Sequence, residues 1–262
     1  MKSSMTRYKT YADKLRLDLK AISTDEKAEA SRRYFPGGVN CIGASASDIK
    51  SIVSNFISRH SELTASGALS IAEYLLQNSQ YNEENLVAFA MINKFVKHNY
   101  EDNLLDRFEF WLEHYADNWS QVDDLCIKTI YLFLMARPHL IEKTQHWAYS
   151  EVSWCRRASN VVWVKFIKRK IGKSTYCLDT RLVFKNCDVL LDDKDVFVQK
   201  SIGWLLKVTS QQHEREVIEY ISNNFAKMTR PTIRYAIEKM DKKTRKSLLA
   251  RTRVNSESLI TS

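Results

Sequence analysis

The stretch IKSIVSNFISRH, residues 49–60, shows the pattern that sets the fold. Its apolar side chains recur at spacings of three and four residues, at Ile49, Ile52, Val53, Phe56 and Ile57. That spacing matches the turn of an α-helix and places all five on one face. Ser47 is the expected N-cap, with Asp48 in the first turn. The stretch therefore predicts an amphipathic helix that packs along one side.

The same spacing recurs through most of the chain. Further helices are predicted over residues 82–98, 102–115, 119–136, 154–169, 195–210, 214–225 and 232–240. Pro138 ends one of them and Pro231 opens another. About ten helices, with pairs starting about every 35–45 residues and no persistent strand alternation, are typical of an α-solenoid. We expect an all-α fold of HEAT-like antiparallel helix pairs forming a curved array with a basic concave groove; an irregular helical bundle is the alternative.

Composition excludes several classes of protein. Six glycines and three prolines in 262 residues are too few for turn-rich β folds or Gly-rich nucleotide folds. No uncharged apolar run suggests a membrane span, and the N-terminus has no apolar signal region. Five cysteines without a CxxC pair disfavour a disulfide framework or a zinc ribbon. We expect an intracellular protein of a reducing compartment, cytoplasmic and nucleoid-associated or nuclear, without a membrane partner.

Positive charge is concentrated in the second half of the chain. Residues 1–150 hold 17 Lys and Arg against 19 Asp and Glu, whereas residues 151–262 hold 23 against 12. Residues 156–173 contain seven basic side chains and no acidic one. A basic surface attracts polyanions, which favours a nucleic-acid partner. A solvated face without a partner is the alternative.

Known catalytic and metal motifs are incomplete. Gly172-Lys173-Ser174-Thr175 resembles the end of a phosphate-binding P-loop, but Ile167 stands where that loop needs its first glycine. No His pairs with another His at a spacing of four residues, which removes the HExxH zinc motif. We therefore expect no metal and no organic cofactor.

Three predicted helices combine aromatic and polar side chains in unusual ways. Trp119 and Asp123 lie one turn apart, so the indole and the carboxylate project together. Arg156 and Arg157 follow Trp154 in the second helix. Gly203 precedes Trp204 inside the third, and an internal helix glycine indicates close approach of another backbone or a ligand. Each element alone fits a core or capping role, but all three lie at comparable places in successive helix pairs.

In order and spacing, these segments resemble the AlkD-type DNA alkylation repair proteins, the HEAT-like repeat DNA glycosylases. Residues 35–44 (FPGGVNCIGA) are similar to the loop that opens that fold, and residues 228–239 are similar to a segment near its end. The resemblance covers roughly 35–246. It implies three domain segments: an N-terminal helical segment over 1–34 that packs on the array, a repeat domain over 35–250, and a flexible tail over 251–262.

The resemblance also implies roles for single residues. Asp123 would be the catalytic carboxylate that faces the lesion sugar, with Trp119 and Trp204 as aromatic walls. Arg157 would hold the DNA backbone near the lesion, with Arg156 as the fallback. Further expected contacts to the DNA backbone are Lys165, Lys168, Arg169 and Lys200. Two features depart from the family: the second acid, Asp124, and a longer interval before Trp204 that indicates a basic loop inserted near residues 170–185.

The implied activity is hydrolysis of the N-glycosidic bond of alkylated purines, such as 3-methyladenine and 7-methylguanine, in double-stranded DNA, by a monomer. A non-catalytic HEAT-like module that binds damaged or unusual DNA is the main alternative. A protein–protein scaffold, the usual role of helical solenoids, is the third.

Overall fold

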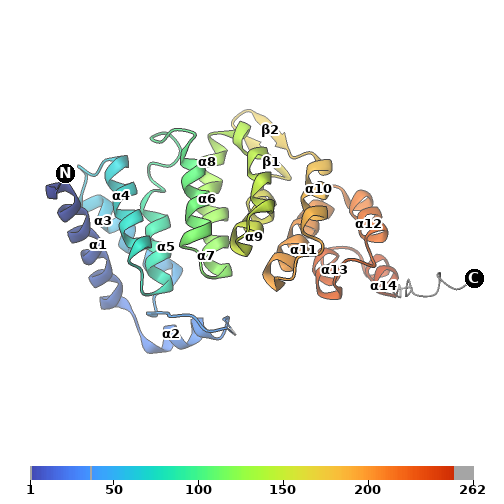
Figure 1. Cartoon of the computed structure of the whole chain (residues 1–262), viewed down its shortest axis with the longest axis horizontal. Coiled ribbons are helices and arrows are strands. Elements are labelled where there is room, and N and C mark those ends of the chain that lie inside the picture. The colour runs from blue at the N-terminus through green and yellow to red at the C-terminus, as the bar shows by residue number, and fades with distance from the viewer. Residues whose placement is uncertain (1, 36, 251–262) are drawn as a thin grey trace, which may run out of the picture. The chain divides into compact units, whose positions relative to one another are not determined.

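The computed structural model describes residues 2–35 and 37–250 of the chain, which divides into two compact units, Met1–Pro138 and His139–Ser262. The helices and strands of both are labelled in Figure 1. The described residues of both are mainly helical, which confirms the all-α prediction. None of the described helices has the length and apolar character needed to cross a membrane.

The first unit contains eight α-helices within its described residues. They are α1 (Lys2–Ile22), α2 (Asp25–Arg32), α3 (Ala46–Arg59), α4 (Ala65–Gln77), α5 (Asn82–Met91), α6 (Leu104–His114), α7 (Trp119–Asp124) and α8 (Tyr131–Met135). A π-helical segment, Leu125–Ile130, joins α7 to α8. The helix predicted over 119–136 is therefore interrupted, although its predicted core stripe is confirmed. The fully buried side chains of that stripe are Val122, Leu125, Cys126, Thr129, Ile130 and Phe133.

The helices of the first unit pack side by side. α3, α5 and α7 form a row, and α1 and α4 pack against α3 and α5. Phe108 of α6 meets Trp111 and Phe133 edge-on, and Trp111 stacks near Phe89 of α5. Four of the five apolar residues of the α3 stripe are buried in this packing, as their spacing predicted, and Ile57 is half-buried.

The start of α3 differs from the prediction by two residues. Ser45, not Ser47, is the N-cap: its side chain accepts a hydrogen bond from Asp48 N, and Asp48 accepts one from Ser45 N. In this reciprocal capping box, the Asp48 carboxylate also accepts a hydrogen bond from Lys27 Nζ at 2.9 Å. These hydrogen bonds hold the pKa of Asp48 down at about 2. Either serine fits a capping pattern, and the turn that enters the helix selects Ser45.

The loop before α3 is fixed to α5 by a buried carboxylate. Glu83, 2% exposed, accepts hydrogen bonds from the backbone N–H groups of Ile42, Gly43 and Ala44 at 2.9–3.3 Å. Gly43 has φ +97°, and a Cβ there would lie 2.1 Å from Thr24 O. Only glycine fits this contact.

The second unit contains six α-helices and one hairpin within its described residues. They are α9 (Ser153–Val161), β1 (Lys168–Ile171), β2 (Ser174–Cys177), α10 (Thr180–Leu190), α11 (Val196–Ser210), α12 (Glu214–Asn223), α13 (Arg230–Ala236) and α14 (Lys242–Ala250). Short 3₁₀ segments cover Pro138–Leu140, Glu142–Tyr149 and Val162–Lys165. The fourteen α-helices of the described chain are thus more numerous, and many are shorter, than the ten expected.

A row of α9, α11 and α13 forms the centre of the second unit, with α10 and α12 packed against α11. Gly203 lies where α11 meets α13: a Cβ there would be 3.0 Å from both Thr232 O and Tyr235 Cβ. The predicted close approach is therefore made by a neighbouring helix. Pro231 opens α13 as predicted, after the N-cap Thr229.

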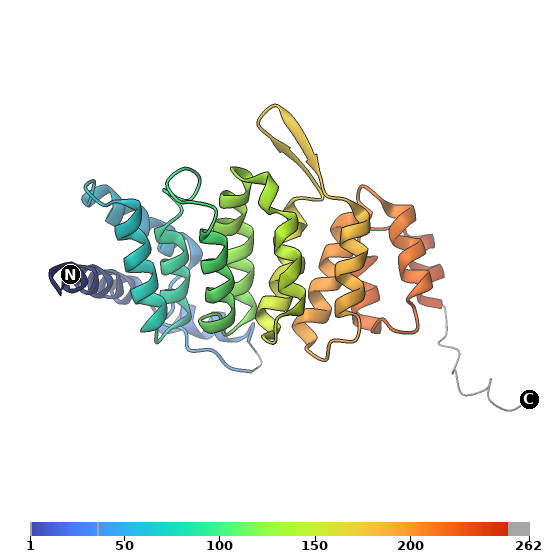
Figure 2. The same ribbon diagram turned by 45° about the horizontal axis from the view of Figure 1, so that its top comes forward.

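The hairpin β1–β2 replaces the end of the helix predicted over 154–169. Its strands pair antiparallel with Ile171 opposite Ser174, and Gly172 enters the turn with φ +59°. Glycine at the first turn position fits a two-residue type II′ turn. Figure 2 shows the hairpin extending away from the helices of this unit. It overlaps the interval near 170–185 where a basic loop was expected, and Gly172-Lys173 form its turn rather than a phosphate loop.

The predicted segment boundary at residue 34 stays a prediction. α1 packs on α3 and α4 inside the first unit. The tail predicted over 251–262 lies outside the described residues.

Candidate nucleic-acid interface

Trp119 is held at the first position of α7 by a network of side-chain amides. Asn118 caps the helix, accepting hydrogen bonds from Ser120 N at 3.0 Å and Gln121 N at 3.1 Å. The Asn118 amide donates to Asn82 Oδ1 at 2.9 Å, at the start of α5. Gln121 donates to the same oxygen at 3.0 Å. The network joins α5 to α7 and fixes the position from which the indole projects.

The Trp119 ring stacks on Phe35. Their centroids are 5.3 Å apart and their planes differ by 24°. Both rings are half-buried, and both line a pocket of about 310 Å³ with Tyr34 and Leu86. Phe35 belongs to the 35–44 segment that carried the family resemblance, but the sequence did not indicate that it would pair with Trp119.

The two acids at the end of α7 have different surroundings. Asp123 is partly exposed and lies one turn after Trp119 on the same helix. The Asp124 side chain is 16% exposed and forms an ion pair with Lys128 one turn on. Burial raises the pKa of Asp124, and Lys128 opposes that rise. Asp123 is therefore the carboxylate that shares a helix face with Trp119, while Asp124 belongs to the wall of a neighbouring cleft.

That cleft, which we call the α3–α5 cleft, has a volume of about 750 Å³ and lies entirely in the first unit. Its floor is apolar, with Val53 and Ile57 from α3 and Leu86 from α5. Its polar residues include Ser54, Lys50, Asn93, Lys94, Asp124 and Lys128. The sequence did not indicate this cleft, because its lining residues come from three separate segments.

Trp204 lies on α11 in the second unit, half-buried, next to the close contact at Gly203. Trp119 and Asp123 belong to the first unit, and Trp204 and every predicted cation belong to the second. The structure therefore brings together the predicted acid and the first aromatic wall. The other predicted residues all lie in the second unit.

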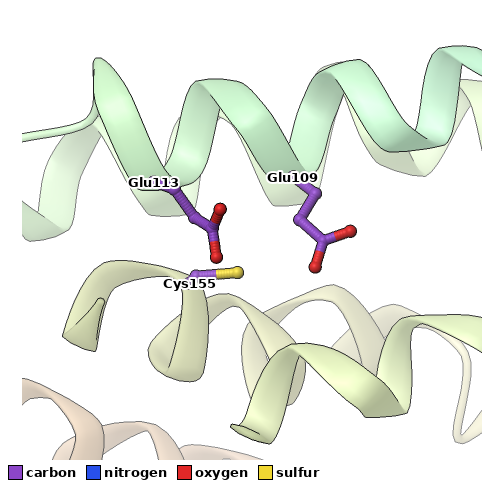
Figure 3. A group of neighbouring side chains, drawn as sticks. All are labelled: Glu109, Glu113 and Cys155. Atoms are coloured by element: carbon purple, nitrogen blue, oxygen red, sulfur yellow. The ribbon is translucent and has the colours of Figure 1, made fainter. Parts of the chain in front are cut away.

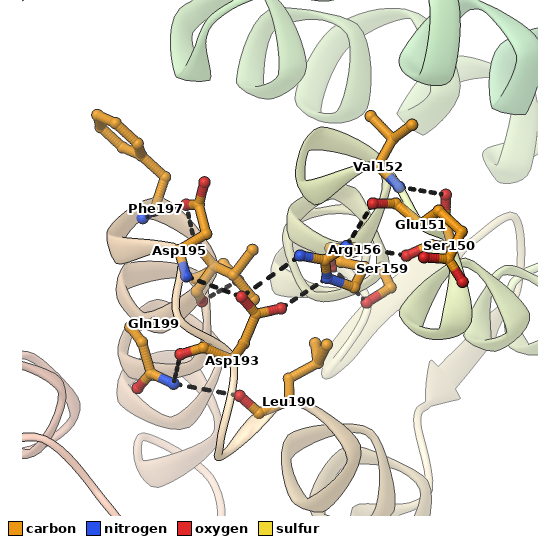
Figure 4. Close-up of polar contacts among 12 residues, drawn as sticks. Ser150, Glu151, Val152, Arg156, Ser159, Leu190, Asp193, Asp195, Phe197 and Gln199 are labelled. Atoms are coloured by element: carbon orange, nitrogen blue, oxygen red, sulfur yellow. Dashed lines mark hydrogen bonds and ion pairs between the residues drawn. The ribbon is translucent and has the colours of Figure 1, made fainter. Parts of the chain in front are cut away.

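The two predicted arginines are integrated into the fold of the second unit. Arg157 is only 5% exposed and donates to Phe197 O at 2.6 Å. Arg156 pairs with Asp193, with Nε 2.6 Å from Oδ2, and donates to the carbonyls of Ser150 and Glu151 at 2.9 Å (Figure 4). This geometry argues against Arg156 as a phosphate-binding residue. Its donors tie the segment before α9 to the segment before α11.

Exposed positive charge is found on the hairpin and on α11. Lys168 and Arg169 lie on β1, not on a helix, and both are exposed. Lys200 is exposed on α11, with Nζ 5.0 Å from the centre of the Phe197 ring. Lys165, in the preceding 3₁₀ segment, is half-buried. Lys168, Arg169 and Lys200 therefore offer a phosphate the most accessible charges among the predicted residues.

Within either unit, the described residues show no group of three or more side chains placed to ligate a metal together. Glu109 and Glu113 project from the same side of α6, one turn apart (Figure 3). Two carboxylates are fewer than the three or four protein ligands that zinc sites use.

The model of the DNA alkylation repair enzyme family matches residues 15–240. The chain belongs to the DNA alkylation repair enzyme family. No curated protein matches the sequence.

Two solved structures share the fold of this DNA alkylation repair family member. One is described as a predicted DNA alkylation repair enzyme from Enterococcus faecalis, with a TM-score of 0.72 and 17% identity, covering 84% of this chain and 97% of that one. The other is the alkylpurine DNA glycosylase AlkC of Pseudomonas fluorescens, bound to DNA containing an abasic-site analogue. It has a TM-score of 0.50 and 13% identity, covering 94% of this chain and 66% of that one. At these identities the likeness shows the helical-repeat fold.

Proposed function

We propose that this chain is a DNA glycosylase that hydrolyses the N-glycosidic bond of alkylated, cationic purines in duplex DNA. The observation that carries the proposal is the pairing on α7: an indole held by Asn118 and Phe35, with the Asp123 carboxylate one turn later. The family match to DNA alkylation repair enzymes supports it. The AlkC structure, which contains DNA with an abasic-site analogue, supports DNA as the partner.

The chemistry suits these residues. A purine alkylated on a ring nitrogen is cationic and leaves readily, and breaking its bond to the sugar builds positive charge on the sugar. The Asp123 carboxylate stabilises that charge and orients a water for attack. The electron-rich face of Trp119 attracts both the cationic base and the developing sugar cation. The reaction needs no cofactor for this mechanism, because the leaving group already carries the activating charge.

Exposed cations of the second unit would hold the DNA backbone. Lys168, Arg169 and Lys200 are exposed and can each neutralise a phosphate, which makes affinity depend on salt. Trp204 is proposed as the second aromatic contact near the lesion.

The test is release of 3-methyladenine and 7-methylguanine from alkylated duplex DNA by the purified protein, with a chelator present. Release above the spontaneous rate that Asp123→Asn abolishes supports the proposal. Release that is no faster than without protein refutes it.

A non-catalytic DNA-binding module is the second candidate. The observation that favours it is the burial of Arg157, whose guanidinium donates to Phe197 O. Arg157 cannot bind the DNA backbone beside a lesion unless its hydrogen bond to Phe197 O is broken. Tight, salt-dependent binding to damaged duplex without base release would identify this function.

A further inference from the structure

The backbone around Phe35 is tied down on both sides of this residue. Phe35 N donates to Arg32 O at 2.9 Å, which extends the last turn of α2, and Gly38 N donates to Phe35 O at 2.8 Å. Further along the loop, Asn40 O accepts a hydrogen bond from Asn82 N at 2.8 Å. The position of the Phe35 ring is therefore set by α2 and by the start of α5.

Two neighbouring residues at the start of α5 support both aromatic partners. Asn82, 9% exposed, accepts hydrogen bonds at 2.9 and 3.0 Å from the two side-chain amides that hold the first turn of α7 and thus Trp119. Glu83, 2% exposed, accepts the backbone hydrogen bonds that fix the end of the 35–44 loop. The separation of the Phe35 and Trp119 rings is thus set within the protein.

The indole of Trp119 needs a contact from outside its own helix to fix its orientation. Trp119 is the first residue of α7, so no preceding helical turn restricts its side-chain rotamers. The pocket of about 310 Å³ that borders both rings gives the indole room to turn. The Phe35 ring, with its centroid 5.3 Å from that of the indole, selects one orientation. Trp119 is half-buried, so part of the indole stays exposed beside this stack.

We propose that Phe35 is a positioning residue for base excision: its ring holds the Trp119 indole in the orientation that meets the cationic purine. The proposal rests on the proposed function, in which Trp119 contacts the lesion. An indole that is already oriented needs no reordering when the lesion arrives, so more of its attraction for the cation lowers the barrier. Phe35 acts through Trp119 and need not touch the DNA.

The test is single-turnover excision of 7-methylguanine by variants of Phe35. Phe35→Leu keeps the apolar bulk and removes the flat ring, so the excision rate should fall about fivefold, on the scale of one aromatic pair. Affinity for undamaged duplex should stay unchanged, because Phe35 carries no charge for the DNA backbone. Phe35→Tyr keeps the ring and should excise at nearly the wild-type rate. A folded Phe35→Leu protein that excises as fast as wild type would overturn the proposal.

Phe184→Leu is the matched control. Phe184 is also half-buried and stacks on Tyr220 in the second unit, with ring centroids 4.8 Å apart and planes that differ by 11°. Its loss should lower the melting temperature as Phe35→Leu does and leave the excision rate unchanged. Equal slowing in Phe184→Leu would mean that the rate follows stability, which would refute the role of Phe35. If Phe35→Leu melts early, Phe35→Met takes its place.

A double-mutant cycle shows whether Phe35 acts through Trp119. In a Trp119→Leu background, Phe35→Leu should slow excision no further, because the indole that it orients is gone. Two losses that multiply would mean that Phe35 acts on the DNA or on the fold directly, and this result is incompatible with a positioning role.

A spectroscopic measurement follows the indole independently of activity. Labelling with fluorotryptophan gives one fluorine resonance for each of the six Trp residues, and Trp119→Leu identifies the Trp119 resonance by its loss. Phe35→Leu should shift this resonance, because the ring current of the neighbouring ring is lost, whereas Phe184→Leu should not. An unmoved resonance would show that Phe35 does not orient the indole.

The proposed function and the role of Phe35 can fail separately. If the wild-type protein releases no methylated purine, the proposed function fails and the role of Phe35 fails with it. If wild type and Phe35→Leu release the base equally fast, only the role of Phe35 fails.

Discussion

The two units use their charged residues in opposite ways. The first unit, nearly neutral in composition, places a carboxylate beside an indole on α7 and lines a large cleft with lysines. The second unit is strongly basic, yet Arg156 and Arg157, at the start of its densest basic stretch, make internal contacts. Of the cations predicted to bind DNA, the exposed ones are Lys168 and Arg169 on the hairpin and Lys200 on α11. A count of basic residues therefore overstates the charge that a surface presents, because the fold itself uses part of it.

The largest effect expected in this comparison is catalytic and belongs to the first unit. Asp123→Asn keeps the size of the side chain and removes its charge, so excision of methylated purines should fall at least about a hundredfold. DNA affinity should hold or rise slightly, because one repulsion with phosphate is lost. Single-turnover excision assays with binding measured in parallel test this.

Asp124→Asn is the matched control. Asp124 lies about 100° further around the helix and is paired with Lys128, so excision should change far less. If Asp124 proves essential and Asp123 dispensable, the catalytic carboxylate is the one in the cleft wall. Should both variants excise normally, the carboxylate mechanism fails.

The next effect is on stability and concerns the close contact between Gly43, in the loop before α3, and Thr24. Gly43→Ala forces a Cβ to within 2.1 Å of Thr24 O at a φ that only glycine tolerates. Strain of this kind costs roughly 1–3 kcal/mol before the clash is added. A melting curve should show a clear loss of stability. Gly37→Ala, where a Cβ meets nothing within 4 Å, is the control and should melt as wild type.

A third pair of variants separates internal from surface charge in the second unit. Arg156→Ala leaves the Asp193 carboxylate, 7% exposed, without its main partner and should cost about 2–3 kcal/mol of stability. Lys168→Ala should leave stability unchanged and lower the salt slope of DNA binding by about one, where Lys168 contacts a phosphate. A stable Arg156→Ala variant with a reduced salt slope would reverse the assignment of these two residues.

The smallest effect is a pH dependence confined to the first unit. The pKa of Asp48 lies at about 2, below its ordinary value, because Lys27 and Ser45 hydrogen-bond to the ionised form. A lowered carboxyl pKa stabilises the fold above the unfolded pKa near 4, and this contribution is lost as pH falls toward 2. Asp48→Asn should therefore lower the melting temperature at pH 7. The difference in melting temperature between Asp48→Asn and wild type should shrink as the pH falls from 4 to 2. A difference that stays constant over this range would contradict the prediction.

Much of the helical framework was predictable because burial imposes a local period. The stripe through Ile49, Val53 and Phe56 is buried as its spacing requires. The hairpin was missed because its strands are mostly exposed and carry no alternating apolar pattern, leaving Gly172 as the only signal. The π-helical segment was missed for a different reason: its buried residues fit an α-helical stripe equally well.

The helical class, the family and the placement of Trp119 and Asp123 on one helix were predictable, because each depends on residues near one another in the chain. The packing of distant segments set which charges are available. It buried Arg157, paired Arg156 with Asp193 and stacked Phe35 on Trp119. Solvent exposure and distant partners depend on how separate segments pack, and a local period contains no information about that.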